Sequence, residues 1–163
     1  IRLGGLGAMP FRAAGTAARG NVGVTADSVE TPSKQDQVAE YWNNSDVQNF
    51  MTTIPTDMSE YGTIVSGVGI AGAPDQVVAI MQNLTDLDNA VLKITDVGSD
   101  NAAYSVQQKV NQAAVAYNEA ALNMQSAMQN SDSALLQTAQ QQLTNATSVF
   151  EEITGVYNAA VAE

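Results

Sequence analysis

The sequence contains no cysteine and no histidine. Without cysteine the chain can form neither a disulfide framework nor a thiolate metal site, and oxidised pairs give no information about its redox compartment. Without histidine it lacks the commonest general base and the commonest metal ligand in proteins. We therefore expect no metal and no cofactor, and we interpret the chain as a protein that is not an enzyme.

Basic residues and charge in general are scarce. Six basic residues stand against 17 acidic ones, which gives a net charge of -11, yet only 14% of the 163 residues are charged, against a usual share of about 25%. Nucleic acids and anionic lipids both require clusters of Lys or Arg. We expect neither as a partner, and we expect a surface made largely of uncharged polar groups.

Long apolar runs are also missing. No stretch approaches the roughly 18 residues of a membrane span, so we expect no membrane insertion. The first 20 residues, "IRLGGLGAMPFRAAGTAARG", lack the continuous apolar core of a secretory signal. Export, if it occurs, is expected by a route that does not read such a signal or after removal of a leader.

Three regions follow one another along a chain whose length suits one folded unit. Residues 1–33 form a Gly/Ala-rich arm, residues 34–100 a helical region with a Gly-rich connector at 62–74, and residues 101–163 an antiparallel helical hairpin. The predicted fold is all-α: a C-terminal helical hairpin, one or two further helices, and a Gly-rich extended N-terminal segment. We expect this arm to clasp a neighbouring subunit.

The helical region contains a break and a stop. The spacing over residues 34–54 predicts two short helices broken near Asn43 to Ser45, with Ser45 or Asp46 capping the second, and Pro55 ends the pattern. A longer helix is predicted to start at Pro74 and to carry one apolar stripe. The residues of this stripe are Val77, Ile80, Leu84, Leu87, Val91 and Ile94.

Two further stripes define the hairpin. The first consists of Val106, Val110, Ala113, Tyr117, Ala120 or Ala121, Met124 and Met128. The second alternates steps of three and four without a fault through Leu136, Ala139, Leu143, Ala146, Phe150, Ile153, Tyr157 and Ala160. Such regularity favours helices packed at shallow angles. The short linker "QNSDS" can join only antiparallel neighbours, and Ser131, Asp132 or Ser133 is available to cap the second helix.

One glycine motif imitates a nucleotide site. Gly67, Gly69 and Gly72 spell G-x-G-x-x-G before a predicted helix. In a dinucleotide-binding fold the helix begins inside this motif, so that its first amides hold the pyrophosphate. Here Pro74 places the helix start after the motif, and no further βαβ units follow. We interpret the motif as a connector.

Two pairs of acidic residues imitate a catalytic site. Asp86 and Asp88 form one pair, and Glu151 and Glu152 form the other. Carboxylates that share acid–base chemistry must face one another in a dry cleft, whereas residues one or two apart on a helix do not. We interpret both pairs as parts of solvated helix faces.

The hairpin is unusual for the missing charges on its polar face. This face holds Gln107, Gln108, Asn111, Gln112, Asn118, Asn123, Gln125, Gln137, Gln140, Gln141, Asn145 and Ser148. Covering an amide or hydroxyl that finds a hydrogen bond costs far less than covering an ion. We therefore predict a polar inter-subunit face at Gln137, Gln141 and Ser148. Hairpin packing and the rest of the interface are assigned to Tyr117, Met124, Met128, Leu136, Leu143, Phe150, Ile153 and Tyr157.

Residues 127–153 of the hairpin read "AMQNSDSALLQTAQQQLTNATSVFEEI", a helical pair around a short polar turn that continues into a Gln-rich helix. In this text the hairpin resembles the needle and inner-rod subunits of bacterial type III secretion systems. The segment "NSDVQNFMTTI", residues 44–54, is similar to an amphipathic stretch of inner-rod proteins. The length fits a longer extracellular filament subunit of the same export pathway better. The resemblance implies a helical tube that conducts unfolded cargo.

The patterns predict a structural subunit that self-assembles, and the resemblance implies that the assembly is a helical bacterial filament or tube associated with protein secretion. Its expected partners are identical copies and other secretion-apparatus proteins, and its expected location is a secreted or cell-surface appendage. Two alternatives stay open. One is a soluble helical adaptor or chaperone-like module that binds a foreign partner through its Met and aromatic residues. The other is a virion or phage structural protein.

Overall fold

The computed structural model describes residues 31–163, and this part of the chain is all-α, as predicted. The predicted arm therefore lies outside the described residues except for its last three. The helices are α2 (Lys34–Trp42), α3 (Ser45–Gly67), the 3-10 helix η3 (Ile70–Gly72), α4 (Pro74–Leu92), α5 (Tyr104–Asn130) and α6 (Ser133–Ala162).

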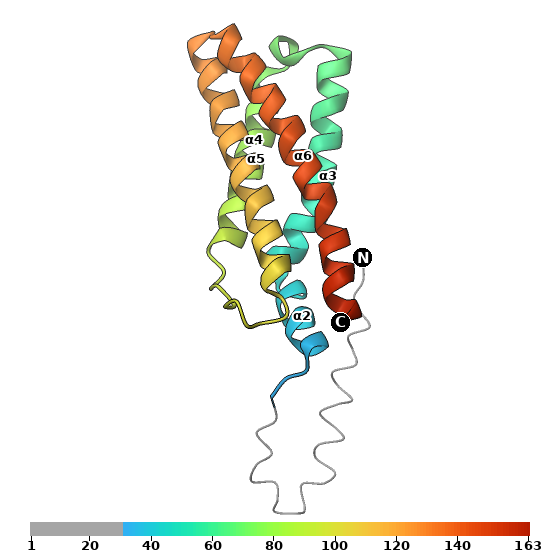
Figure 1. Cartoon of the computed structure of the whole chain (residues 1–163). Helices are drawn as coiled ribbons and strands as arrows, with labels where there is room; N and C mark the ends of the chain where they lie inside the picture. The colour runs from blue at the N-terminus through green and yellow to red at the C-terminus, as the bar shows by residue number, and fades with distance from the viewer. Residues whose placement is uncertain (1–30) are drawn as a thin grey trace, which may run out of the picture.

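The four long helices lie side by side in an elongated bundle (Figure 1). Each packs on the next one along the chain, so that α3 contacts α4, α4 contacts α5, and α5 contacts α6. The short helix α2 lies at the base and contacts α6. The α5–α6 pair has the most extensive contact, which confirms the predicted helical hairpin.

The break between α2 and α3 lies where the sequence placed it, but the capping residue differs. Asn44 is the N-cap of α3, and its side-chain oxygen accepts a hydrogen bond of 2.8 Å from the amide of Asp46. The prediction of Ser45 or Asp46 was wrong because both already lie inside the helix. Asparagine is among the best N-cap residues, since its short side chain reaches the orphan amides of the first turn.

Helix α3 continues through Pro55 to Gly67, so the predicted stop at Pro55 was wrong. Proline inside a helix removes one hydrogen bond and crowds the preceding turn. Here Pro55 lies on the exposed side, where water can satisfy the carbonyl that loses its donor. Buried side chains on both sides of the proline, among them Phe50, Ile54 and Tyr61, hold the helix together through tertiary packing.

The connector between α3 and α4 is therefore residues 68–73, which is shorter than the predicted 62–74. Gly69 has a positive φ of 77°, which a side chain would strain, and a Cβ on Gly72 would lie 2.8 Å from the Cβ of Val68. The glycines thus serve a tight turn. Pro74 is the first residue of α4, as predicted, and follows the whole motif.

The loop between α4 and α5 is fastened by a buried glutamine. Gln107 has no exposed surface, so its assignment to the solvated polar face was wrong. Its side-chain oxygen accepts from the amide of Val97 at 2.8 Å, and its amide nitrogen donates to the carbonyl of Thr95 at 3.0 Å. A buried amide that makes both bonds costs little, and it fixes the loop.

In the turn of the hairpin, one residue ends α5 and the next residue caps α6. Ser131 has a φ of 55° and ends α5 in the left-handed conformation, from which its amide reaches back to Met128. Asp132 caps α6 by accepting a 2.9 Å hydrogen bond from the amide of Leu135. Asp132 is one of the three capping residues that the sequence offered.

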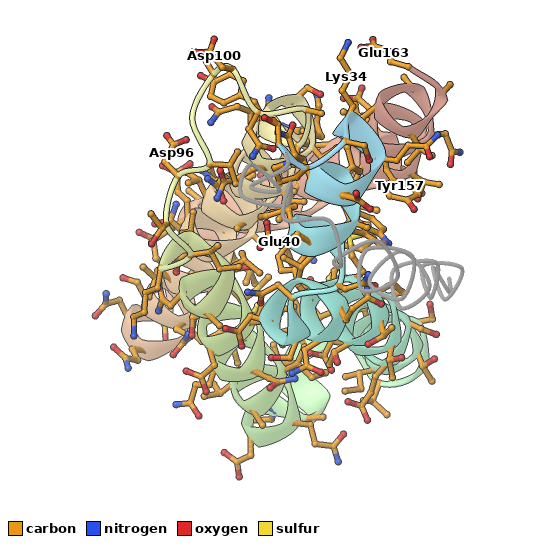
Figure 2. All side chains as sticks on the ribbon, turned by 90° about the horizontal axis from the view of Figure 1, so that it is seen from below. Lys34, Glu40, Asp96, Asp100, Tyr157 and Glu163 are labelled. Atoms are coloured by element: carbon orange, nitrogen blue, oxygen red, sulfur yellow. The ribbon has the colours of Figure 1, made fainter. Side chains whose placement is uncertain are left out.

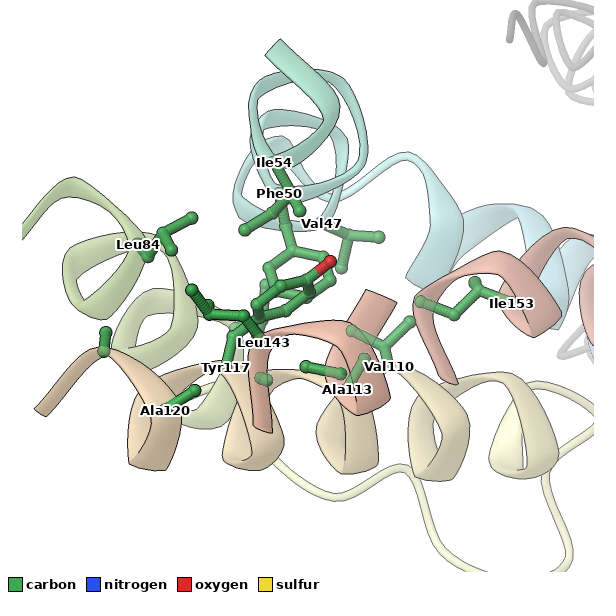
Figure 3. Close-up of a cluster of buried hydrophobic side chains, with 14 of the residues drawn as sticks. Val47, Phe50, Ile54, Leu84, Val110, Ala113, Tyr117, Ala120, Leu143 and Ile153 are labelled. Carbon is green, nitrogen blue, oxygen red and sulfur yellow. The ribbon is translucent and has the colours of Figure 1, made fainter. Parts of the chain in front are cut away.

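The core runs through the middle of the bundle and draws on all four long helices (Figure 3). Large side chains such as Phe50, Leu84 and Tyr117 fill its centre. Small residues line α5 and α6, which lets these helices approach closely. Eight alanines with little or no exposed surface lie on these two helices: Ala113, Ala114, Ala120, Ala121, Ala127, Ala139, Ala146 and Ala160.

Candidate interaction surfaces

The side chains predicted to pack the hairpin divide into two groups. Tyr117, Met124, Leu143 and Ile153 are fully buried inside the bundle. Tyr117, Met124 and Ile153 have no exposed surface, so their part is packing within the subunit. Leu143 is 2% exposed and also lines a groove between α3 and α6. The other four are half-buried against the core: Met128, Leu136, Phe150 and Tyr157.

Two of the half-buried residues attach α6 to helices other than its hairpin partner. Tyr157 stacks on Trp42 of α2 with ring centroids 4.3 Å apart. Phe150 lies 5.6 Å from Phe50 of α3 and 6.2 Å from Tyr117 of α5, measured between ring centroids. Aromatic pairs at these distances add to stability beyond the area that they bury. The sequence pattern gave no signal for these contacts, because it cannot show which helices meet.

Gln137, Gln141 and Ser148, the predicted polar face, are all exposed on α6. Between residues 110 and 150 the hairpin carries only two charged side chains, Glu119 and Asp132. Residues 31–100 carry 12 charged side chains. Figure 2, which views the bundle from its base, shows some of the charged groups that gather at that end: Lys34, Glu40, Asp96, Asp100 and Glu163.

Two exposed apolar side chains lie in this weakly charged region. Val115 and Leu122 are 56% and 55% exposed, and they lie one heptad apart on the outer side of α5. Val68, in the α3–α4 connector, is the third large apolar side chain that is exposed in residues 31–163. The stripe pattern missed Val115 and Leu122 because they lie off the buried stripe, although their seven-residue spacing was visible.

A groove with a volume of about 450 Å³ lies between α3 and α6. Its apolar walls come from Met58 and Val65 of α3 and from Leu143 of α6, with the ring of Tyr61 beside them. The polar side chains that line it all belong to α6: Gln140, Thr144, Thr147, Ser148 and Glu151.

The hydroxyl groups of the groove are largely occupied within α6. Thr144 donates to the carbonyl of Gln140 at 3.2 Å, and Ser148 donates to the carbonyl of Thr144 at 3.3 Å. The Tyr61 hydroxyl is buried, and the Gln140 side chain lies near it. Burial raises the pKa of Tyr61, and hydrogen bonding with the Gln140 side chain partly offsets this effect.

A second hollow, of about 400 Å³, lies at the tip of the bundle between the α3–α4 connector and the hairpin turn. Its apolar lining includes Ile70, Pro74, Met128 and Leu136. Ser131, Asp132 and Ser133 of the turn form its polar edge. This hollow explains why Met128 and Leu136 are only half-buried.

The prediction that Asp88 lies on a solvated helix face was wrong, because Asp88 is 0% exposed. Neither carboxylate oxygen has a hydrogen-bond partner in the described part of the chain. Burial raises the pKa of Asp88 to about 8, and its charge in turn contributes to the raised pKa of Tyr117. Asp88 continues the buried stripe of α4 between Leu84 and Val91, which is the signal that could have found it.

Three other acidic residues lie in different surroundings. Glu151 and Glu152 are exposed on α6, as predicted, and Glu152 forms a 2.8 Å salt bridge with Lys109. Asp57 is buried and accepts a hydrogen bond from Asn83. Within residues 31–163 no three acidic side chains come together as a metal ion would require.

None of the described helices is both long enough and apolar enough to cross a membrane. Comparisons of the chain with family models, with curated proteins and with solved structures found no match.

Proposed function

We propose that this chain is a structural subunit that self-assembles into a helical polymer. The observation that supports the proposal best is the uneven distribution of charge. The described bundle is strongly acidic, with 15 acidic against three basic residues in 31–163, yet the hairpin between residues 110 and 150 carries only two charges. Copies that meet through this region avoid placing like charges opposite one another.

The chemistry of the outer face agrees with a surface that is covered by another copy. Exposed amides such as Gln137 and Gln141 lose less free energy on desolvation than ions do, provided that they find hydrogen bonds. Val115 and Leu122 add apolar surface in the same hairpin.

The resemblance to needle and inner-rod subunits suggests where such a polymer acts. We propose an exported or cell-surface appendage of a bacterial secretion system, with identical copies and other secretion-apparatus proteins as partners. A virion or phage structural protein would share the same assembly behaviour, and imaging of the native assembly distinguishes the two.

Light scattering and negative-stain microscopy of the purified chain across a range of concentrations test the proposal. We expect particles that lengthen with concentration. A monodisperse monomer at every concentration would contradict it. The triple variant Gln137→Glu, Gln141→Glu, Ser148→Glu should keep its helical circular dichroism and lose the polymer, because it places charges on the proposed face.

A matched control puts the same three charges on another helix. Thr52, Thr56 and Thr63 are exposed on α3, and their change to Glu adds the same net charge at a different place. If polymers are lost equally in both triple variants, general repulsion rather than the α6 face decides assembly. Retention of polymers in the α3 variant alone supports the face named here.

A second candidate, a helical adaptor or chaperone-like module, is favoured by the groove between α3 and α6. An open groove with apolar walls can hold an amphipathic segment of a foreign protein. This function predicts a discrete complex and no polymer. In that case Gln141→Glu should leave the assembly state unchanged.

A further inference from the structure

We propose that the groove between α3 and α6 receives the N-terminal segment of a neighbouring copy of the same chain, residues 1–12. This inference rests on the proposed self-assembly and specifies one contact that would hold the copies together. The groove, the sequence of the segment, its charge and its length support the inference independently.

The groove suits an extended segment with a few apolar side chains. Its open shape and the walls formed by Met58, Val65 and Leu143 offer apolar contact along two helices. Its threonine and serine hydroxyls already donate to carbonyls of α6, so they do not require polar partners.

The N-terminal sequence has the matching pattern. Small residues at Gly4, Gly5, Gly7 and Ala8 allow the backbone to approach a helix surface closely. Between and beside them stand five large apolar side chains: Ile1, Leu3, Leu6, Met9 and Phe11. A segment of this kind buries apolar side chains in a groove while its backbone stays near the walls.

Charge favours the same pairing. All three arginines of the chain lie in the first 30 residues, which carry a net charge of +1, whereas residues 31–163 carry -12. Glu151 lines the groove and is exposed on α6. Attraction between Arg2 or Arg12 and this acidic surface therefore adds to the apolar contact.

The chain is long enough to reach a neighbour. The 20 residue-to-residue steps from Phe11 to Thr31 can span about 66 Å when extended. Helix α6, with 30 residues, is roughly 45 Å long. A segment with this reach can extend past its own bundle to the groove of the next copy.

Charge is also compatible with an exchange of this segment between copies. Two bundles that each carry -12 repel one another. Residues 1–30 carry a net charge of +1, so a segment that lies between two bundles offsets a small part of this repulsion.

Disulfide trapping in the full-length chain tests the inference, and the absence of native cysteine removes any background. One chain carries Leu6→Cys, and a second, isotope-labelled chain carries Thr144→Cys in the groove. The two are mixed, assembled and oxidised, and linked peptides are identified by mass spectrometry. Thr138→Cys, which is exposed on the same helix outside the groove, is the matched control.

We expect disulfides between the two chains at Thr144→Cys to exceed those at Thr138→Cys by about tenfold or more, because docking raises the local thiol concentration. The triple change of Arg2, Arg12 and Arg19 to Gln should reduce this excess. Equal yields at the two positions would overturn the inference. A double variant, Leu6→Cys with Thr144→Cys, that links only within its own chain would overturn it as well, because the segment would then occupy its own groove.

The same experiment separates this inference from the proposed function. Polymers without preferential linkage at Thr144→Cys leave self-assembly intact and reject the exchange of segments. A chain that never forms polymers rejects both. Circular dichroism of each variant shows that the bundle is folded, so that misfolding is not mistaken for a lost contact.

Discussion

Helix α5 has two interfaces, and they differ in whether their buried polar groups find hydrogen-bond partners. On the side of α6, polar groups are paired: the hydroxyls of Tyr117 and Thr147 are 2.8 Å apart, and Asn123 donates to Gln142 at 2.8 Å. On the side of α4, the carboxyl group of Asp88 is fully buried near Tyr117 without a hydrogen-bond partner in the described residues.

The difference indicates which interface is stabilised by its buried polar groups and which is destabilised by them. Paired polar groups across α5 and α6 make the packing specific, and their desolvation costs little free energy. The hairpin should therefore be more stable than the contact between α4 and α5. An unpaired carboxyl group makes the position of α4 dependent on protonation, since a buried charge without a partner is very unfavourable. Changes at the two interfaces should therefore differ in size and in pH dependence.

The largest expected effect comes from Asp88→Asn. The pKa of Asp88 is raised from 3.8 to about 8 by burial, so between these values the folded state binds more protons than the unfolded state. Stability from this group therefore falls as pH rises, by roughly 1.4 kcal/mol per pH unit. The variant should be more stable than the natural chain at pH 8 by a few kcal/mol, and the gain should vanish near pH 4.

Urea unfolding of both proteins at several pH values measures this difference. Asp86→Asn is the matched control, because Asp86 is exposed two residues away on the same helix. If the Asp86 variant shows the same pH-dependent gain, the effect comes from net charge, and the orphaned carboxyl group is not its source.

An intermediate effect is expected from Ala146→Leu. Ala146 is fully buried on α6, which packs chiefly on α5. A larger side chain forces the two helices apart, and overpacking of this kind lowers the free energy of unfolding by about 1–3 kcal/mol. Ala159→Leu, exposed on the same helix, should change stability by less than about 0.5 kcal/mol. Thermal unfolding of the two variants checks the prediction, and equal melting temperatures would contradict it.

The smallest effect is expected from Tyr117→Phe. The change removes the hydroxyl that pairs with Thr147, while Thr147 keeps its hydrogen bond to the carbonyl of Leu143. Because no buried donor is left without a partner, the free energy of unfolding should fall by only about 0.5–1.5 kcal/mol. Chemical denaturation of this variant measures that decrease. A loss above about 3 kcal/mol would show that the hydroxyl has a larger role in the interface than one neutral hydrogen bond.

The sequence predicted the hairpin well because one physical cause, burial of a helical stripe, decides it. The regular stripe of α6 and the polar turn at Asp132 were sufficient. Pro55 misled the prediction because its local cost is outweighed by packing on both sides of it. The predictions for Gln107 and Asp88 were wrong because the residue type alone does not show whether a polar side chain is buried or exposed.

The groove between α3 and α6 could not be predicted from the sequence. The groove exists because of the distance between α3 and α6 in the folded bundle. Helices α4 and α5 separate these two helices in the sequence, so the sequence does not show that distance. Tyr61 and Val65 give no local signal that they line a hollow. The amide-rich face of α6, in contrast, was visible as a composition, and Ser148 belongs to both that face and the groove.

The order of packing also has a consequence for how quickly the chain folds. Most contacts join helices that follow one another in the sequence, and such a low contact order is typical of domains that fold in microseconds to milliseconds. Helix α6 makes the exceptions, because it also contacts α3 and α2, and its contact with α2 brings the two ends of the described chain together. The single tryptophan of the chain, Trp42, stacks on Tyr157 at this contact, so its fluorescence should report the closing step separately from helix formation.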